Sequence, residues 1–213
     1  MYVARMGRTQ EDRRTETRGL LIDAASELFA LKGFHATSAE AVASAAGRTT
    51  GALYDHFGGK EGLLVALLEH WMDETLLDLA TTLGGEAELD RRLEILWDGV
   101  VRRDDETGGA WLLLEFELWL HAVRDSELGQ VGAQRFTVMR DGLSTGLHEW
   151  SVEFGFPLPE PAPVLAVQVI GLILGAAFQH RLDPASVPRT VVVSGLARLL
   201  GLDLSRTKPK GTS

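Results

Sequence analysis

The sequence predicts an all-α protein with a small N-terminal three-helix domain and a larger C-terminal helical domain. Apolar residues recur at helical spacing in every long segment, and no run shows the strict alternation that is typical of a half-buried strand. Glycine and proline clusters separate these segments. The 213 residues, 45% of them hydrophobic, suffice for one large or two modest cores. The expected domains cover residues 1–62, with a flexible arm over 1–14, and residues 63–203, followed by a flexible tail over 204–213.

The first helix is expected from about Glu16 to Lys32. Apolar residues from Leu21 to Phe29 recur there at helical spacing. Gly33 follows, and glycine is the residue type that most often ends a helix. This helix is expected to brace the two short helices behind it.

Two short helices should come next. Thr37 and Glu40 have the spacing of a capping box, in which each side chain accepts a hydrogen bond from the backbone at a helix start, so a helix should begin near Ser38. Gly47 can take the left-handed conformation that ends a helix and turns the chain. Thr49 then has the position of the N-cap of the next helix.

This order of elements is a helix-turn-helix, in which the second helix offers its N-terminal residues to base edges in the major groove. DNA binding is therefore the first functional hypothesis. Leu53 and Phe57 lie four residues apart on one helical face and are expected to pack inward. The candidate base-reading residues are Thr50, Gly51, Ala52, Tyr54, Asp55 and His56.

A set of residues at fixed spacing extends from the first helix into the fourth. It consists of Leu28-Phe29, Gly33-Phe34, Thr37, Val42-Ala43, Ala46-Gly47, Thr49, Gly51, Leu53-Tyr54, His56-Phe57, Lys60-Glu61 and Leu63-Leu64. With these residues the chain resembles the tetracycline-repressor (TetR) family of bacterial transcription regulators. An ordinary pair of short helices is the alternative, but caps, turn and apolar spacing agree over nearly the whole segment.

The resemblance implies roles for single residues. Tyr54 and Lys60 are expected to contact phosphates, Thr37 or Ser38 to do so from the first short helix, and the recognition helix to run from Thr49 to His56. Arg48 stands where the family usually carries an apolar residue and is expected to point outward toward phosphate, and Gly59 replaces a more usual polar N-cap. The candidate DNA-binding residues are Thr37, Ser38, Arg48, Thr49, Thr50, Gly51, Ala52, Tyr54, Asp55, His56 and Lys60.

The rest of the chain keeps its helical pattern. A long helix should start near Lys60 and end near Leu83, where Gly84-Gly85 stops it, and it can transmit movement to the DNA-binding end. A proline cluster at 157, 159, 161 and 163 should break the chain after Phe154. The further helices are expected over about 89–101, Ala110–Arg124, Ser126–Phe154, Ala162–Leu182 and Val187–Leu202. The apolar segment after Ala110 should be buried on most sides.

Four of the five tryptophans fall in the three helices that would surround the centre of the second domain. Large aromatic residues beside small ones such as Gly142 and Gly146 can leave a cavity between facing helices. The candidate ligand-binding residues are Trp97, Trp111, Glu115, Trp119, Phe136, Met139 and Trp150, with Glu117 and His121 as further polar groups. The alternative is that the tryptophans are core and the acids solvated. The resemblance implies a small-molecule effector that releases DNA when it fills this pocket.

The last two helices suggest a subunit interface. Glycines spaced as G-x-x-x-G let another helix approach closely, and a C2 dimer would give two helices from each chain to a four-helix bundle. The alternative is that these helices are the core of a monomer. The apolar run over 164–178 has fifteen residues, short of the roughly 20 that span a membrane, so no membrane insertion is expected. The candidate interface residues are Gly171, Gly175, Leu196 and Leu200.

The charge is unevenly distributed. The net charge is −9, but residues 1–60 carry eight Lys/Arg against seven Asp/Glu, whereas the remainder carries 13 against 23. An acidic body repels phosphates, so DNA should dock only at the N-terminal end.

Enzyme function is the main rival class, and the sequence argues against it. The six histidines never recur at i, i+4, and no nucleophile elbow, P-loop or dinucleotide glycine pattern is present. Glu117 with His121 could form a metal or acid–base pair, but a salt bridge is the more ordinary outcome. We therefore expect no catalytic residues, no metal and no cofactor. The absence of cysteines and of an N-terminal apolar run suits a cytoplasmic protein. A helical protein-interaction or small-molecule-binding module without DNA binding is the remaining alternative.

Overall fold

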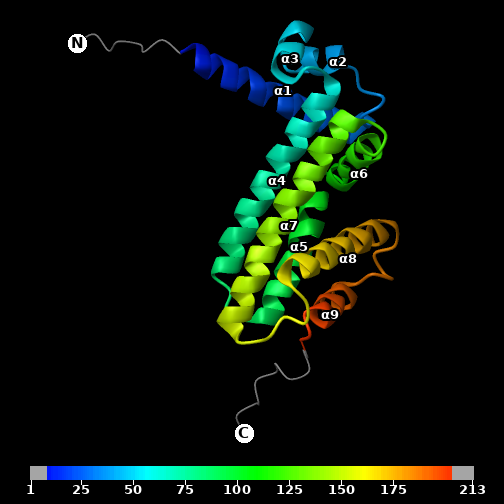
Figure 1. Ribbon diagram of the computed structural model, residues 1–213. Coiled ribbons are helices and arrows are strands. Elements are labelled where there is room, and N and C mark those ends of the chain that lie inside the picture. Colours follow the sequence, from blue (N-terminus) through cyan, green and yellow to red (C-terminus); the bar gives the residue numbers. More distant parts are fainter. Residues whose placement is uncertain (1–8, 203–213) are drawn as a thin grey trace, which may run out of the picture. The chain divides into compact units, whose positions relative to one another are not determined.

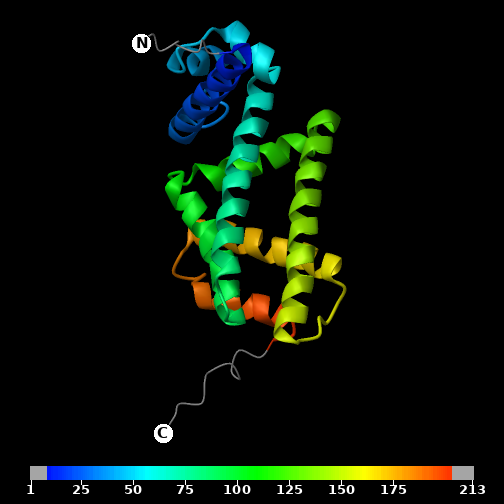
Figure 2. The same ribbon diagram turned by 90° about the vertical axis from the view of Figure 1, so that its left-hand side faces the viewer.

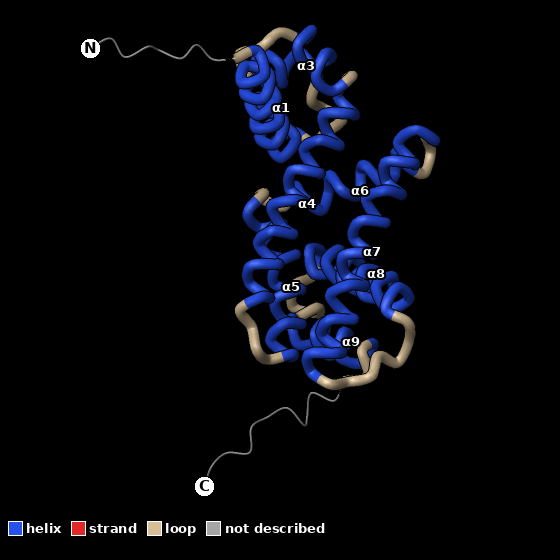
Figure 3. The backbone as a smooth tube through the Cα atoms, turned by 60° about the vertical axis from the view of Figure 1, so that its left-hand side comes forward, coloured by secondary structure: helices blue, strands red, loops and turns tan. Residues whose placement is uncertain are grey.

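A computed structural model describes residues 9–202, and every regular element within that range is an α-helix, as predicted (Figures 1 and 3). By its internal contacts the chain forms two compact units. Unit 1 comprises Met1–Asp73 and Thr107–Leu118, and unit 2 comprises Glu74–Glu106 and Trp119–Ser213. This division differs from the expected boundary after residue 62, because one long helix contributes residues to both units. The expected tail over 204–213 lies outside the described residues.

Unit 1 contains the three N-terminal helices and the start of the fourth. The first helix begins earlier than expected, at Gln10, because Thr9 and Asp12 form a capping box: the Thr9 hydroxyl accepts from Asp12 N at 3.1 Å and the Asp12 carboxylate accepts from Thr9 N at 2.8 Å. The expected flexible arm is therefore helical from Gln10 onward, and residues 1–8 lie outside the described residues. The helices are α1 (Gln10–Lys32), α2 (Ala39–Ala45), α3 (Thr50–Phe57) and α4 (Lys60–Gly84).

The core of unit 1 forms where α1 packs against α2 and α3. Leu21, Phe29, Phe34 and Leu53 are each at most 2% exposed. The rings of Phe29 and Phe34 meet edge to face with centroids 5.3 Å apart. Burial of such large side chains supplies the main stabilisation that holds three short elements together. The predicted inward face of α3 is confirmed at Leu53, whereas Phe57 is only half-buried.

Unit 2 contains the C-terminal helices, of which α7 and α8 have the predicted bounds. Helix α8 packs against α7, α9 and α5, and Figure 2 shows α8 and α9, coloured orange and red, side by side. Helix α9 is shorter than expected at both ends, and α6 ends before Arg124. The helices are α5 (Leu89–Glu106), α6 (Ala110–Ala122, shared with unit 1), α7 (Ser126–Phe154), α8 (Ala162–Leu182) and α9 (Arg189–Leu199).

A buried arginine joins α5 to α7 within unit 2. The Arg92 guanidinium donates to both carboxylate oxygens of Glu153, at 2.6 and 2.9 Å, and to the backbone oxygen of Glu86 at 2.8 Å. It also lies over the rings of Trp150 and Phe154, 5.7 and 4.7 Å from their centroids. A bidentate pair of this kind fixes the relative register of the two helices.

Two apolar helices leave large side chains exposed. Helix α8 is long and apolar enough to cross a membrane by length and composition, with a mean hydropathy of 1.9, so the fifteen-residue run understated its length. Only 28% of that apolar window is buried. In α6, Leu113 and Leu120 are exposed, so the expectation that this helix is buried on most sides is wrong on that face.

Candidate nucleic-acid interface

The two short helices are defined by their caps. Ser38 is the N-cap of α2, since its hydroxyl accepts from Ala41 N at 3.1 Å, and Thr49 caps α3 in the same way through Ala52 N at 3.1 Å. Gly47, with φ of +63°, makes the turn between them, which confirms its predicted left-handed conformation. The helix-turn-helix geometry expected from the sequence is therefore present, and the predicted cap at Thr49 is confirmed.

Thr37 has a different role from the one expected. It is only 2% exposed, and its hydroxyl donates to the backbone oxygens of Gly33 and Leu28, at 2.9 and 3.3 Å. The N-cap of α2 is Ser38 rather than Thr37, so the predicted capping box is wrong by one residue. A hydroxyl that is buried against the end of α1 stabilises the loop and cannot reach a phosphate, whereas Ser38 is exposed.

Lys60 is also held within unit 1. Its ammonium donates to the backbone oxygens of Phe34 and Thr37, at 2.9 and 3.0 Å, and lies 4.2 Å from the centroid of the Phe34 ring. The resemblance implied a phosphate contact, but the three contacts hold the amine against the connection between α1 and α2. This expectation is corrected: Lys60 positions the helix-turn-helix from inside.

Arg48 points back toward α1 rather than freely outward. Its Nε donates to the Thr17 hydroxyl at 3.2 Å, and Nη1 donates to the backbone oxygen of Gly47 at 3.1 Å. An arginine replaces the usual apolar residue here because its stem can cover the turn while its head reaches a polar partner on α1. The guanidinium is thereby fixed at the mouth of a groove.

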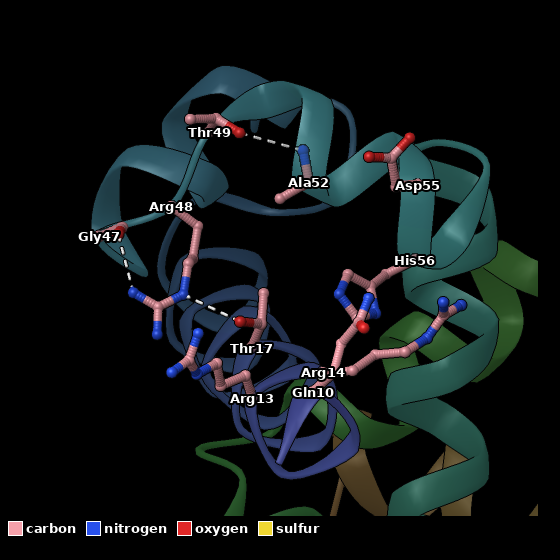
Figure 4. A pocket seen from close by; sticks show the side chains of 10 residues that line it. All are labelled: Gln10, Arg13, Arg14, Thr17, Gly47, Arg48, Thr49, Ala52, Asp55 and His56. Carbon is pink, nitrogen blue, oxygen red and sulfur yellow. Dashed lines mark hydrogen bonds between the residues drawn. The ribbon is translucent and has the colours of Figure 1, made fainter. Parts of the chain in front are cut away.

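This groove separates the start of α1 from the turn and α3, and it has a volume of about 620 Å³. Figure 4 shows Arg48 and Thr17 joined by a hydrogen bond at one end and Arg14 beside His56 at the other. The sequence analysis missed its α1 wall, although the capping signal at Thr9 and Asp12 places Arg13 and Arg14 on a helix. The lining residues are Gln10, Arg13, Arg14, Thr17, Gly47, Arg48, Thr49, Ala52, Asp55 and His56.

The electrostatic environment of His56 reflects this groove. Burial lowers the pKa of His56, the Arg14 cation lowers it further, and the neighbouring Asp55 carboxylate opposes the shift. A histidine with a lowered pKa is neutral at pH 7. It can then gain a proton when an anion approaches, because a nearby negative charge favours the charged form.

The outward face of α3 carries the remaining predicted contacts. Thr49, Gly51, Tyr54 and Asp55 are exposed, and Tyr54 is 54% exposed although it is a large aromatic residue. The half-buried residues of this set are Thr50, Ala52 and His56. The α3 surface therefore offers hydroxyl, phenol, carboxylate and imidazole groups, which can donate to or accept from base edges.

The predicted ligand-binding residues are divided between the units. Trp111 and Glu115 belong to unit 1, and the other five belong to unit 2. In unit 2, Trp119 and Phe136 lie with ring centroids 5.1 Å apart, whereas Trp97 packs edge to face against His180 at 5.5 Å. A second cavity, of about 600 Å³, lies between α4 and α5 and is lined by none of the predicted ligand-binding residues.

The predicted interface residues also separate into two groups. Gly171 and Gly175 lie on the exposed side of α8, where an added Cβ atom would meet no neighbour within 4 Å. Leu196 and Leu200 are 0% and 1% exposed within their own chain. Their selection as interface residues is corrected, because they form the core that supports α8 and α9 and leave no surface for a partner.

Residues 21–67 match the family model described as bacterial regulatory proteins of the tetR family. This chain belongs to the TetR family. The TetR-family match covers the end of α1, the helix-turn-helix and the start of α4, the same segment on which the resemblance rested. Among curated relatives, the chain is 35% identical over 89 residues to the transcriptional activator FasR of Mycolicibacterium smegmatis. That alignment covers 40% of this chain and 41% of FasR, so less than half of either protein is matched.

Solved structures match over nearly the whole chain. A protein from Rhodococcus sp. assigned to the TetR family superposes with a TM-score of 0.73, covering 87% of this chain and 99% of that one at 20% identity. The multidrug binding protein EbrR, solved in complex with imidazole, gives a TM-score of 0.66, covering 95% and 100% at 23% identity. These likenesses confirm the predicted TetR-like all-α fold. Family membership also supports the prediction that the chain is not an enzyme.

Proposed function

We propose that the chain is a DNA-binding transcription regulator that recognises a palindromic operator as a homodimer and responds to a small, largely apolar effector. The observation that carries the proposal is the outward face of α3, where Gly51, Tyr54 and Asp55 are exposed beside a groove lined by arginines. In a helix-turn-helix this face enters the major groove. The α3 side chains would read base edges, and phosphate contacts would set the orientation.

Dimerisation is proposed through α8. Its exposed apolar residues include Val164, Val167 and Phe178, on the helix that carries Gly171 and Gly175. A second copy of this helix would cover them and place two recognition helices on one duplex. The mass of the purified protein in solution tests this step, with Val167→Lys as the disrupting variant and Val152→Lys, on an exposed residue of α7, as its control. A protein that sedimented with membranes instead would contradict the interface.

The operator is found by selection of bound duplexes from a random library. The expected result is a palindrome whose half-sites lie about one helical turn or slightly more apart, as a twofold dimer requires. Tyr54→Phe should weaken binding without changing thermal stability, since the phenol is exposed. A monomer that bound no duplex at low ionic strength would disprove the proposal and favour an interaction module without DNA binding.

Effector binding is proposed for the aromatic residues of the second domain. EbrR is named as a multidrug binding protein, which supports an effector that is small and apolar. Binding can change operator affinity only if the effector favours one of two arrangements of the recognition helices. Tryptophan fluorescence can identify binding compounds, and operator release at saturation tests the coupling. We propose repression as the usual outcome, by occupation of the operator, although FasR is an activator. A regulator that binds chromosomal DNA works in the cytoplasm.

A further inference from the structure

The arginines of unit 1 differ from those of unit 2 in their partners. Within residues 9–202 the arginine ion pairs lie in unit 2, for example Arg92 with Glu153, Arg181 with Asp104, and Arg189 with Asp98. Among the same described residues, no ion pair includes the four arginines of unit 1, which are Arg13, Arg14, Arg18 and Arg48. The chain has 30 Asp/Glu for 21 Lys/Arg, so carboxylates are plentiful. Cations that stay without a carboxylate in an acidic protein remain available to an external anion.

Three of these cations line one groove. Arg13, Arg14 and Arg48 all border the 620 Å³ groove, while Arg18 lies over the Phe57 ring, 5.5 Å from its centroid. Asp55 is the one carboxylate among the groove's lining residues, and Figure 4 shows it turned away from the Arg14 and His56 side chains. The groove is therefore a concave surface of positive charge.

Arg48 is oriented before any ligand arrives. The Thr17 hydroxyl accepts from its Nε and the Gly47 carbonyl accepts from Nη1, so two of its nitrogen atoms are fixed by neutral groups. Both acceptors are uncharged, so the full positive charge of the guanidinium is kept. Arg13 precedes Thr17 by four residues on α1 and therefore shares its helical face. The two guanidinium groups thus flank the same threonine.

We infer that Arg13, Arg14 and Arg48 form a phosphate seat, which takes the sugar–phosphate backbone of the bound duplex between α1 and α3. The inference rests on the proposed function. Guanidinium groups bind phosphate oxygens through paired N–H donors, and a fixed fork binds with a smaller loss of conformational freedom. One wall of the groove is α3 itself, so a strand seated there borders the major groove that α3 enters. Thr17 acts as a positioning residue through Arg48.

The salt dependence of operator binding tests the seat. Each arginine–phosphate contact that is lost should lower the slope of log affinity against log salt by about 0.9. Arg13→Gln with Arg48→Gln should therefore reduce the slope by about two contacts and weaken binding by roughly tenfold for each arginine. The loss should be equal for the operator and for a mismatched operator, because phosphate contacts carry no base information.

The control makes the same charge change elsewhere. Arg91→Gln with Arg124→Gln removes two exposed arginines of unit 2 and should leave the slope of the wild type. Thr17→Val should reproduce the loss of Arg48→Gln, and Thr17→Ser should restore affinity because it keeps the hydroxyl. Thermal unfolding of each variant shows whether unit 1 is still folded, and Arg13→Gln, on an exposed side chain, tests the seat without Arg48.

The outcomes separate the seat from the proposed function. A wild type that binds its operator, with an unchanged slope in the Arg13→Gln and Arg48→Gln variants, would overturn the seat and leave the proposed function intact. A loss confined to the matched operator would also overturn it, since that is the signature of base reading. A wild type that bound no duplex would disprove both.

Discussion

The ammonium of Lys60 lies 2.9 Å from the backbone oxygen of Phe34 and 4.2 Å from the centroid of the Phe34 ring. The first residue of α4 is thereby tied to the chain between α1 and α2. Hydrogen bonds from a charged donor contribute about 1.5–3 kcal/mol each, and the oxygens left behind would be without a donor. Lys60→Met should therefore lower the free energy of unfolding of unit 1 by about 2 kcal/mol or more.

The measurement is chemical denaturation, and Lys32→Met, at an exposed lysine near the end of α1, is the control that should change stability little. Operator affinity of Lys60→Met should fall only by the fraction of protein that is unfolded. A fully stable Lys60→Met protein that had lost its DNA binding would return Lys60 to the phosphate role.

Gly62 should not tolerate a side chain. A Cβ atom there would lie 1.9 Å from the backbone oxygen of Phe57, so the turn between α3 and α4 would have to open. Gly62→Ala should destabilise unit 1 by about 2 kcal/mol or more. Gly19→Ala is the matched control: its Cβ meets nothing within 4 Å, and it should stabilise α1 by about 0.5–1 kcal/mol. Thermal unfolding distinguishes the two, and equal melting temperatures would refute the close approach.

His56 should make both stability and operator binding depend on pH. Burial and Arg14 lower its pKa in the folded state, so the unfolded state binds more protons as pH falls through the ordinary pKa of about 6.5. The free energy of unfolding should therefore decrease on acidification and level off below the folded-state pKa. A bound phosphate raises that pKa, so operator binding takes up a proton and affinity should rise as pH falls.

Operator titrations between about pH 5.5 and 8 at constant ionic strength measure this linkage. His56→Gln should flatten the dependence of affinity on pH, whereas His148→Gln, at an exposed histidine of unit 2, should not. A slope unchanged by His56→Gln would assign the proton to another group.

The Arg92–Glu153 pair should matter more than an exposed pair. Glu153→Gln removes the charge that faces a guanidinium whose side chain is 8% exposed, while Glu153 itself is 51% exposed. Because solvent screens the exposed partner, we expect a loss of about 1–2 kcal/mol, below that of a fully buried pair. Glu149→Gln, one turn earlier and exposed, should change stability by less than about 0.5 kcal/mol. Equal losses in urea unfolding would show that the pair contributes nothing special.

Local signals in the sequence were enough where they bound an element on both sides. Helices α7 and α8 begin and end as predicted because the proline cluster separates them, and α3 begins as predicted because Thr49 is a strong cap. The start of α1 was misplaced although Thr9 and Asp12 carry the same kind of signal. Their polar surroundings were interpreted as a flexible arm, and a capping box outweighs such composition.

Roles that depend on tertiary contacts could not be obtained from spacing. Periodicity places Leu196 on an apolar face, but it cannot say whether that face meets the same chain or another. Lys60 matches a motif position, yet its amine is held by carbonyl oxygens of residues far earlier in the chain. Arg48 shows the same limit, because its partner Thr17 lies on a separate helix.

The arginines of unit 1 that face no carboxylate should govern how the protein behaves during purification. With an isoelectric point near 5.2, the molecule should adhere to an anion-exchange resin at neutral pH. It should nevertheless also be retained by heparin, whose sulfates compete for the same guanidinium groups. A chain with this charge separation will therefore carry nucleic acid fragments through a first column, and a high-salt wash will be needed before its absorbance reports protein alone.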